Sequence, residues 1–264
     1  YPDGSAFQLK QKLSEQLGVA TDCLTVGNGS NDVLELLARV FLKPGHNTVV
    51  SQHAFVVYGL VTQSLGATLR EVPCVDYQQD LDATLAMIDD QTRIVFIANP
   101  NNPTGSYLSA SVIETFLSAV PSHVVVVLDE AYNEYLSPEQ RYNAIDWVKR
   151  FPNLLVSRSF SKAYGLAGLR LGYSVAQPEL TDLLNRIRQP FNVNTLAQAA
   201  AIAALFDQEF LDQGATLNRQ GYQQLTTAFT QMGLHYLPSS GNFILVQVGA
   251  DDGAGARVNL ALLK

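Results

Sequence analysis

The sequence predicts an α/β protein with a mostly parallel central sheet, helices on both faces of that sheet, and an incomplete smaller α+β domain. Three observations support this prediction. Strand-like, β-branched runs alternate with segments of helical periodicity, polar motifs directly follow several of those runs, and the composition changes after Pro190. Alternating strands and helices are typical of parallel strands joined by crossover helices, which cover both faces of the sheet.

The elements follow from local patterns. Strands are predicted where apolar residues run together, and helices where they recur at helical spacing, as they do between Val33 and Phe41. In chain order we expect a helix over 31–42, strands over 48–51, 68–72 and 93–98, a helix over 111–119, strands over 124–128 and 153–157, a helix over 179–187, an Ala-rich helix over 195–205 with further helical sequence to about 232, and a strand over 243–248. We expect a large domain over residues 1–192, then a linking helix and an incomplete small domain over residues 193–264.

The overall composition is that of a globular protein. The chain has 264 residues, 47% of them hydrophobic, with 18 glycines and 11 prolines, which argues against a disordered or fibrous chain. This length fits one large domain, or one domain with a smaller second domain. The net charge of −7 argues against a general nucleic-acid binder and against a binder of anionic membranes, because both need a positive surface.

The cysteine content and the hydropathy of the chain exclude further classes of protein. Cys23 and Cys74 form no CxxC pair and the chain has only 4 histidines, so neither a disulfide scaffold nor a metal site is indicated, and a cytoplasmic location fits best. No stretch approaches the roughly 18 to 20 apolar residues of a membrane span, and no signal peptide precedes the first motif. The chain starts at Tyr1 without methionine and stops at Lys264 just after a loop, so we expect both ends to be trimmed.

The most informative segment, at 157–172, reads SRSFSKAYGLAGLRLG. A predicted strand runs here into a polar turn with Lys162, and Arg170 follows eight positions later. A lysine flanked by hydroxyls could be held half-buried with a lowered pKa, as Schiff-base chemistry requires, although a solvated loop lysine is the plainer interpretation. Ser159-x-x-Lys162 also matches the SxxK signature of acyl-transfer serine enzymes, but the chain contains neither SDN nor KTG.

Two more motifs follow predicted strands. Asp129, in Leu-Asp-Glu-Ala-Tyr, ends an apolar run, and the carboxyl ends of strands in an open α/β sheet face the ligand crevice. A helix N-cap is the alternative interpretation of Asp129. The segment 99–105, Asn-Pro-Asn-Asn-Pro-Thr-Gly, favours a rigid turn that could present the Asn102 amide.

The fourth motif, Gly-Asn-Gly-Ser-Asn-Asp at 27–32, immediately precedes a predicted amphipathic helix. A flexible turn before a helix offers unpaired N–H groups and a positive dipole end, which suit a phosphate group. Ordinary helix capping by Ser30 or Asn31 is the plainer interpretation. The motif lacks the third glycine of GxGxxG, and no GxxxxGKS or GxxxxGKT occurs, so nucleotide binding through those motifs is not supported. Each motif alone is weak evidence, but four motifs, each at a strand end or a helix start, are not.

In their order along the chain, these motifs resemble those of fold-type I aminotransferases that use pyridoxal 5′-phosphate (PLP), and above all those of histidinol-phosphate aminotransferases. The resemblance covers nearly the whole chain: Tyr-Pro-Asp, Gly-Asn-Gly-Ser, Asn-Pro-Asn-Asn-Pro-Thr-Gly, Asp-Glu-Ala-Tyr and Ser-Lys-Ala-Tyr-Gly-Leu-Ala-Gly-Leu-Arg. It implies ping-pong transamination between histidinol phosphate and 2-oxoglutarate, in histidine biosynthesis. An aromatic amino acid aminotransferase, a threonine-phosphate decarboxylase-like enzyme and a non-catalytic binding module with the same fold remain alternatives.

The resemblance also implies roles for individual residues. Lys162 would form the Schiff base with PLP and later move a proton on the substrate. Asp129 would pair with the pyridinium nitrogen of the cofactor. Asn102 and Tyr132 would hydrogen-bond the phenolic oxygen of the cofactor. Phe55 would stack on the cofactor ring, with plain core packing as the alternative.

The resemblance further implies partners for the cofactor phosphate. These are the backbone N–H groups of Gly29, Ser30 and Asn31, the hydroxyls of Ser159 and Ser161, and the guanidinium of Arg170. Tyr1 would reach the cofactor phosphate of a neighbouring subunit, which implies a homodimer with shared active sites. Small amino and keto acids would be the substrates, and the arginine for the substrate α-carboxylate would lie beyond Lys264.

Overall fold

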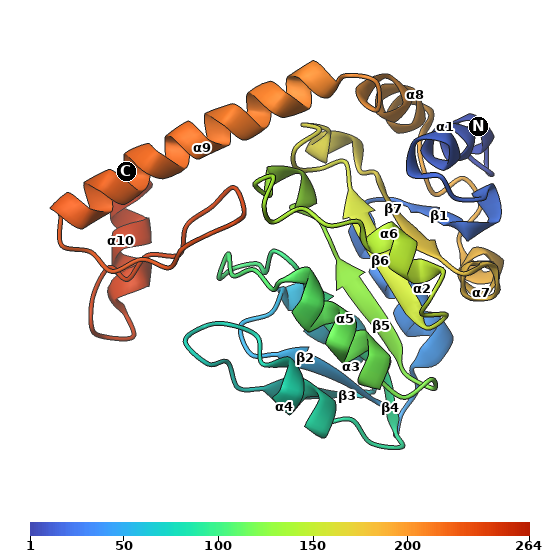
Figure 1. The fold of residues 1–264 in the computed structure, drawn as a ribbon, viewed down its shortest axis with the longest axis horizontal. Coiled ribbons are helices and arrows are strands. Elements are labelled where there is room, and N and C mark those ends of the chain that lie inside the picture. The colour runs from blue at the N-terminus through green and yellow to red at the C-terminus, as the bar shows by residue number, and fades with distance from the viewer.

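The computed structural model describes residues 1–264, whose strands form one seven-stranded sheet in the order β1-β7-β6-β5-β4-β2-β3 (Figure 1). The strands span Leu24–Gly27 (β1), Asn47–Ser51 (β2), Thr68–Val72 (β3), Thr92–Ala98 (β4), Val125–Asp129 (β5), Leu154–Ser159 (β6) and Gly172–Ala176 (β7). Neighbours from β3 to β6 pair in parallel, whereas β7 pairs antiparallel with both β6 and β1. The predicted α/β fold with a mostly parallel sheet is confirmed.

Helices cover both faces of this sheet. They span Phe7–Leu17 (α1), Ser30–Phe41 (α2), Val56–Ser64 (α3), Leu81–Ala86 (α4), Ala110–Ala119 (α5), Ala144–Val148 (α6), Pro178–Ile187 (α7), Thr195–Ala204 (α8), Gln208–Gln231 (α9) and Ala254–Leu262 (α10). Buried side chains of α2, α3 and α7 form one apolar cluster, and those of α1, α4, α5, α6 and α8 form another. Ile94 and Phe96 of β4 belong to the first cluster, and Val95 and Ile97 to the second, because successive strand side chains point to opposite faces.

Most predicted elements are present, with ends shifted by one or two residues. The strand predicted over 68–72 has the bounds of β3, and those over 48–51, 93–98, 124–128 and 153–157 correspond to β2, β4, β5 and β6. The helices predicted over 31–42, 111–119 and 179–187 are α2, α5 and α7, and the helical stretch from 195 to about 232 is α8 followed by α9.

The strand predicted over 243–248 is wrong. Within this segment, Val246 forms only an isolated antiparallel bridge with Tyr236. Two backbone hydrogen bonds flank the bridge, from Leu237 N to Leu245 O at 2.9 Å and from Gln247 N to His235 O at 2.8 Å. The apolar run is therefore extended, but it lacks the ladder of neighbouring strands that stabilises a strand in water.

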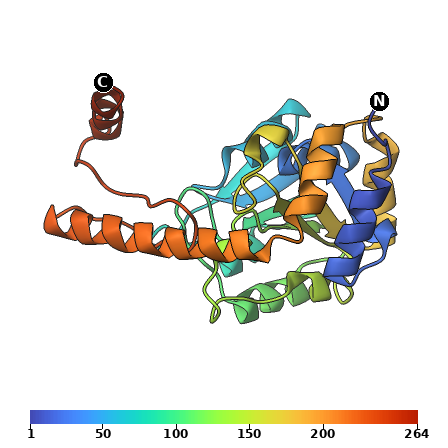
Figure 2. The ribbon, with the colours of Figure 1, turned by 90° about the horizontal axis from the view of Figure 1, so that it is seen from above.

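The C-terminal helices extend away from the sheet. α9 runs outward from the body of the protein, and α10 lies beyond a long extended segment (Figures 1 and 2). Before α9, the helix α8 still packs on the body, since Ala197 and Ala201 belong to the same apolar cluster as α1. The domain boundary after residue 192 remains a prediction.

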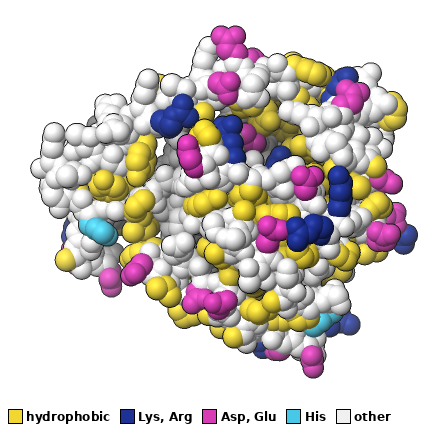
Figure 3. All heavy atoms as spheres, in the orientation of Figure 1, with side chains coloured by type: hydrophobic (Ala, Val, Ile, Leu, Met, Phe, Trp, Pro, Cys, Tyr) yellow, Lys and Arg dark blue, Asp and Glu magenta, His cyan; other side chains and the backbone are white.

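The surface mixes side chains of every type. On the face shown in Figure 3, basic and acidic side chains are interspersed with apolar ones. None of the helices combines the length and the hydropathy that a membrane crossing requires.

Candidate active site

Polar side chains gather at the carboxyl edge of the central strands. In the sheet register, Asp129 at the end of β5 pairs with Ala98 of β4 and with Ser157 of β6. Asp129 follows Val125 and Val127 at intervals of two residues in β5, and these two valines pack in the apolar cluster of α2 and α3. The Asp129 side chain therefore points to the α2 and α3 face of the sheet.

A cavity of about 160 Å³ opens at this edge, and we call it the site cavity. All of the predicted site residues line it except Tyr1 and Gly29: Ser30, Asn31, Phe55, Asn102, Asp129, Tyr132, Ser159, Ser161, Lys162 and Arg170. Four residues that the sequence did not single out complete the lining, namely Tyr58, Ala98, Pro100 and Ala131. The four motifs, distant in sequence, thus meet in one place.

The N-terminus of α2 forms one part of the site cavity. The helix begins at Ser30 with Gly29 as its N-cap, and no side chain caps it, so the interpretation of Ser30 or Asn31 as a capping residue is wrong. The turn, loop and cap hydrogen bonds include none donated by the N–H of Ser30 or Asn31. N–H groups in the first helical turn have no partner within the helix, so these two and the positive helix end are available to an anion.

Two glycines permit close approaches at the same helix end, Gly29 that of Arg170 and Gly172 that of the helix backbone. A Cβ on Gly29, whose φ is 84°, would collide with the guanidinium of Arg170, and a Cβ on Gly172 would collide with the backbone of Ser30. The Arg170 Nη1 donates to Ala167 O at 3.0 Å and to Ser161 Oγ at 3.4 Å. A cation, a hydroxyl and free N–H groups therefore converge there.

Asp32 holds the loop before α2 in place. Its Oδ2 accepts hydrogen bonds from Asn28 N and from Asn192 Nδ2, both at 2.8 Å. Asn192 Nδ2 also donates to Val26 O at 3.1 Å. These bonds tie the loop to the segment before α8 and fix the direction of its N–H groups.

Asp129 forms another part of the site cavity and is buried. Its Oδ2 accepts a hydrogen bond from the Tyr58 hydroxyl at 2.9 Å, and its Oδ1 accepts one from Ala131 N at 3.3 Å. Burial raises the pKa of Asp129 to about 6, while the hydrogen bond from Tyr58 acts in the opposite direction. The helix N-cap interpretation of Asp129 is wrong, since it is the last residue of β5 and no α-helix follows it directly.

Lys162 lies three residues beyond β6 and is half-buried. Its Nζ is 5.1 Å from the centre of the Tyr132 ring. The Tyr132 hydroxyl accepts a hydrogen bond from Asn102 Nδ2 at 3.0 Å. The predicted turn that carries Asn102 is present and is closed by a bond from Gly105 N to Asn101 O at 2.8 Å, with a φ of 74° at the glycine.

Aromatic residues from the start of α3 border the site cavity. Phe55, just before the helix, is half-buried, and its ring meets the Tyr58 ring edge-on with 5.7 Å between centroids. Phe55 was predicted from the sequence as a site residue, whereas Tyr58 was not. The available signal was the spacing, because residues three apart at a helix start share one face.

Tyr1 lies outside the site cavity. Its side chain is fully exposed, and its ring packs against Phe191 with 5.2 Å between centroids. Within one chain Tyr1 therefore contributes nothing to the site, and its role at a neighbouring subunit remains a prediction.

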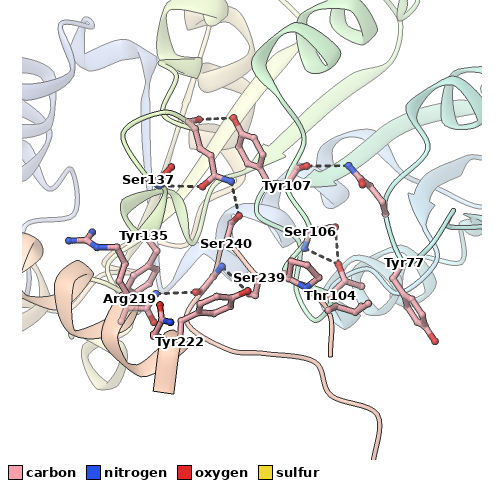
Figure 4. Close-up of a pocket in the computed structure, with 18 of the residues that line it drawn as sticks. Tyr77, Thr104, Ser106, Tyr107, Tyr135, Ser137, Arg219, Tyr222, Ser239 and Ser240 are labelled. Carbon is pink, nitrogen blue, oxygen red and sulfur yellow. Dashed lines mark hydrogen bonds between the residues drawn. The ribbon is translucent and has the colours of Figure 1, made fainter. Parts of the chain in front are cut away.

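Two larger cavities lie beside α9. One, of about 670 Å³, is crossed by hydrogen bonds from Tyr107 Oη to Gln140 O at 2.6 Å and from Gln140 Nε2 to Ser240 Oγ at 3.0 Å (Figure 4). It shares no lining residue with the site cavity. The other, of about 430 Å³, shares Lys162 with the site cavity. Lys162 can therefore be approached from the side of α9.

Comparisons with known proteins agree with these observations. The family model described as aminotransferase class I and II matches residues 1–262. A histidinol-phosphate aminotransferase of Ralstonia nicotianae is 62% identical over 264 residues, which are 100% of this chain and 71% of the relative. One of Cupriavidus pinatubonensis is also 62% identical, over 100% of this chain and 70% of the relative. A structure of histidinol-phosphate aminotransferase from Sinorhizobium meliloti in complex with PLP superimposes with a TM-score of 0.93 at 33% identity, covering 100% of this chain and 71% of that one.

Proposed function

Because the chain belongs to the class I and II aminotransferase family, we propose that it transfers an amino group between histidinol phosphate and 2-oxoglutarate, with PLP as its cofactor. This is a reaction of histidine biosynthesis. The observation that carries the substrate assignment is the 62% identity, over the whole chain, to two histidinol-phosphate aminotransferases. By contrast, an L-threonine-O-3-phosphate decarboxylase from Porphyromonas gingivalis shares the fold at 25% identity.

The residues of the site cavity fit PLP. The N–H groups of Ser30 and Asn31, the hydroxyl of Ser161 and the guanidinium of Arg170 form a donor set suited to a phosphate group. The missing Cβ of Gly29 gives Arg170 its room. Ser159 adds a further hydroxyl: its Oγ accepts from Ser161 N at 3.0 Å and keeps its own proton to donate.

Asp129 gives the same cavity an acidic group. Its carboxylate would accept a hydrogen bond from a protonated ring nitrogen and hold that proton in place. When bound, PLP supplies a ring that withdraws electrons from the substrate Cα. The buried carboxylate would face the protonated ring nitrogen of this cofactor, and the positive end of α2 would face its phosphate. The charges of the cavity therefore complement those of PLP at both ends.

Lys162 supplies the amine. It would hold the cofactor covalently. Once released, it would take a proton from the substrate Cα and deliver that proton to the C4′ carbon of the cofactor. The Tyr132 ring, 5.1 Å from Lys162 Nζ, borders the amine within the cavity. The hydrogen-bonded pair of Asn102 and Tyr132 would hold the phenolic oxygen of the cofactor, and Phe55 would pack against its ring face.

We also propose a homodimer in which Tyr1 contacts the site of the neighbouring subunit. The support is that the Tyr1 side chain is fully exposed beside Phe191, so its hydroxyl is available to a second chain. Sedimentation should then give twice the chain mass, and Tyr1→Phe should weaken PLP binding without dissociating the dimer. A monomer with full activity would contradict this arrangement.

The proposed function is tested by comparing amino donors. With 2-oxoglutarate as acceptor, we expect the highest kcat/KM for histidinol phosphate, above those for phenylalanine and threonine phosphate. Equal turnover of phenylalanine would favour an aromatic amino acid aminotransferase, and release of CO₂ from threonine phosphate would favour a decarboxylase. A protein that remains colourless and inactive after addition of PLP would favour a binding module.

A further inference from the structure

Tyr58 lines the site cavity but has no part in the function proposed above. Its side chain is buried, and its ring stacks on that of Phe96 with 4.6 Å between centroids and an interplanar angle of 4°. The helix that carries it is tied to β2, since Thr62 Oγ1 donates to Tyr58 O at 2.7 Å and lies 2.9 Å from Thr48 Oγ1. A buried ring packed in this way has few alternative rotamers, so the position of its hydroxyl is fixed.

The Tyr58 hydroxyl is directed at one oxygen of Asp129. The bond to Oδ2 is 2.9 Å long, and no other side chain hydrogen-bonds this carboxylate. The second oxygen, Oδ1, has only the Ala131 N–H at 3.3 Å as a partner and so retains acceptor capacity. Tyr58 therefore engages one side of the carboxylate and leaves the other side available.

The charge state of the pair follows from the burial of both groups. Burial raises the pKa of Tyr58 far above its usual range, so the hydroxyl stays protonated and acts as a donor. Burial also raises the pKa of Asp129, and the hydrogen bond from Tyr58 opposes this rise because it favours the ionised carboxylate. Without the hydroxyl, the buried carboxylate would hold a proton more tightly.

We propose that Tyr58 is a positioning residue that fixes the orientation of the Asp129 carboxylate and keeps it ionised, so that Asp129 can hold the proton on the cofactor ring nitrogen. The inference rests on the proposed function, because it assumes that PLP is the cofactor. Tyr58 acts through Asp129 and has no contact with the reacting atoms.

The test compares Tyr58→Phe with a matched control, Tyr107→Phe. The first variant keeps the stacked ring and removes only the hydroxyl. The control removes a tyrosine hydroxyl that donates to Gln140 O at 2.6 Å, in the larger cavity that shares no residue with the site cavity. Carbon-13 NMR of labelled aspartate gives the pKa of Asp129 in the cofactor-free protein, and nitrogen-15 NMR of labelled PLP gives the protonation of the ring nitrogen.

In Tyr58→Phe we expect the pKa of Asp129 to rise by about one to two units, as expected for loss of a hydrogen bond to a charged group. The nitrogen-15 signal should move toward that of a neutral pyridine, and kcat should fall about tenfold with an unchanged KM for histidinol phosphate. Tyr107→Phe should change none of these quantities. Site-specific 3-fluorotyrosine at position 58, a more acidic phenol and a stronger donor, should shift the pKa of Asp129 downward.

The two ways of failing are distinguishable. If PLP binds and transamination proceeds, but Tyr58→Phe keeps the wild-type pKa of Asp129 and the wild-type nitrogen-15 shift, the inference is wrong and the proposed function stands. If Tyr58→Phe changes KM rather than kcat, Tyr58 is a substrate-binding residue and the inference is again wrong. If PLP does not bind at all, the proposed function fails and the inference fails with it.

Discussion

Replacing Asp129 with asparagine should change how the stability of the cofactor-free protein depends on pH. Asp129 is 5% exposed, and burial raises its pKa from the usual 3.8 to about 6. A group whose pKa is higher in the folded chain than in the unfolded chain stabilises the fold fully below its unfolded pKa, and this contribution is lost as the pH rises through the folded pKa. At about 1.4 kcal/mol per pKa unit, the titration of Asp129 changes the free energy of unfolding by about 3 kcal/mol over this pH interval.

The assay is urea unfolding, followed by circular dichroism, of the wild-type protein and Asp129→Asn from pH 4 to pH 7. The difference between the two free energies of unfolding isolates Asp129, because both proteins share every other titrating group. We expect the wild type to lose about 2 to 3 kcal/mol relative to the variant across this range. A difference that does not vary with pH would contradict the raised pKa of Asp129, since Asp129 would then titrate alike in the folded and unfolded chains.

Three further variants address two residues of the site and one buried ion pair of the fold. Lys162→Ala should abolish transamination in a steady-state assay while leaving the urea midpoint nearly unchanged, because the Lys162 side chain is half-buried and the hydrogen bond of this residue, from Gly165 N to Lys162 O, is made by its backbone. Residual turnover near the wild-type rate would rule out its assigned role. Gly29→Ala should weaken PLP binding about tenfold or more in a fluorescence titration, since the new Cβ would collide with the guanidinium of Arg170; wild-type affinity would show that this approach is not needed. Arg158→Met should destabilise the fold by about 3 to 5 kcal/mol at neutral pH, because it leaves the fully buried Glu130 without its partner at 2.8 Å. Adding Glu130→Gln should recover much of that loss in urea unfolding, and no recovery would mean that the ion pair is not the cause.

Local sequence patterns were sufficient to predict the centre of the sheet. β4 and β5 are buried on both faces, so their sequences are nearly continuous apolar runs that can be recognised without knowing their neighbours. β1 and β7 are different, because they are short and contain glycine and hydroxyl residues, and because β1 joins the sheet only by pairing with β7. That pairing joins segments far apart in the chain, and no local pattern reveals it.

The same distinction applies to the site. Lys162, Asp129 and Asn102 lie in recognisable motifs next to predicted strands, so the sequence identified them. Tyr58 lies in no such motif, and its contact with Asp129 joins residues 71 positions apart through the packing of α3 on the sheet. The roles suggested for Ser30 and Asn31 as capping residues failed because the backbone of Gly29 occupies the N-cap position without a side-chain bond.

The covalent attachment of the cofactor is the most direct measurement. Protein incubated with PLP, reduced with borohydride and digested should give one modified peptide, and tandem mass spectrometry should place the pyridoxyl group on Lys162. The Lys162→Ala protein should give no modified peptide. Modification of a different lysine, or none in the folded wild-type protein, would contradict the assignment of Lys162 and the aminotransferase chemistry built on it.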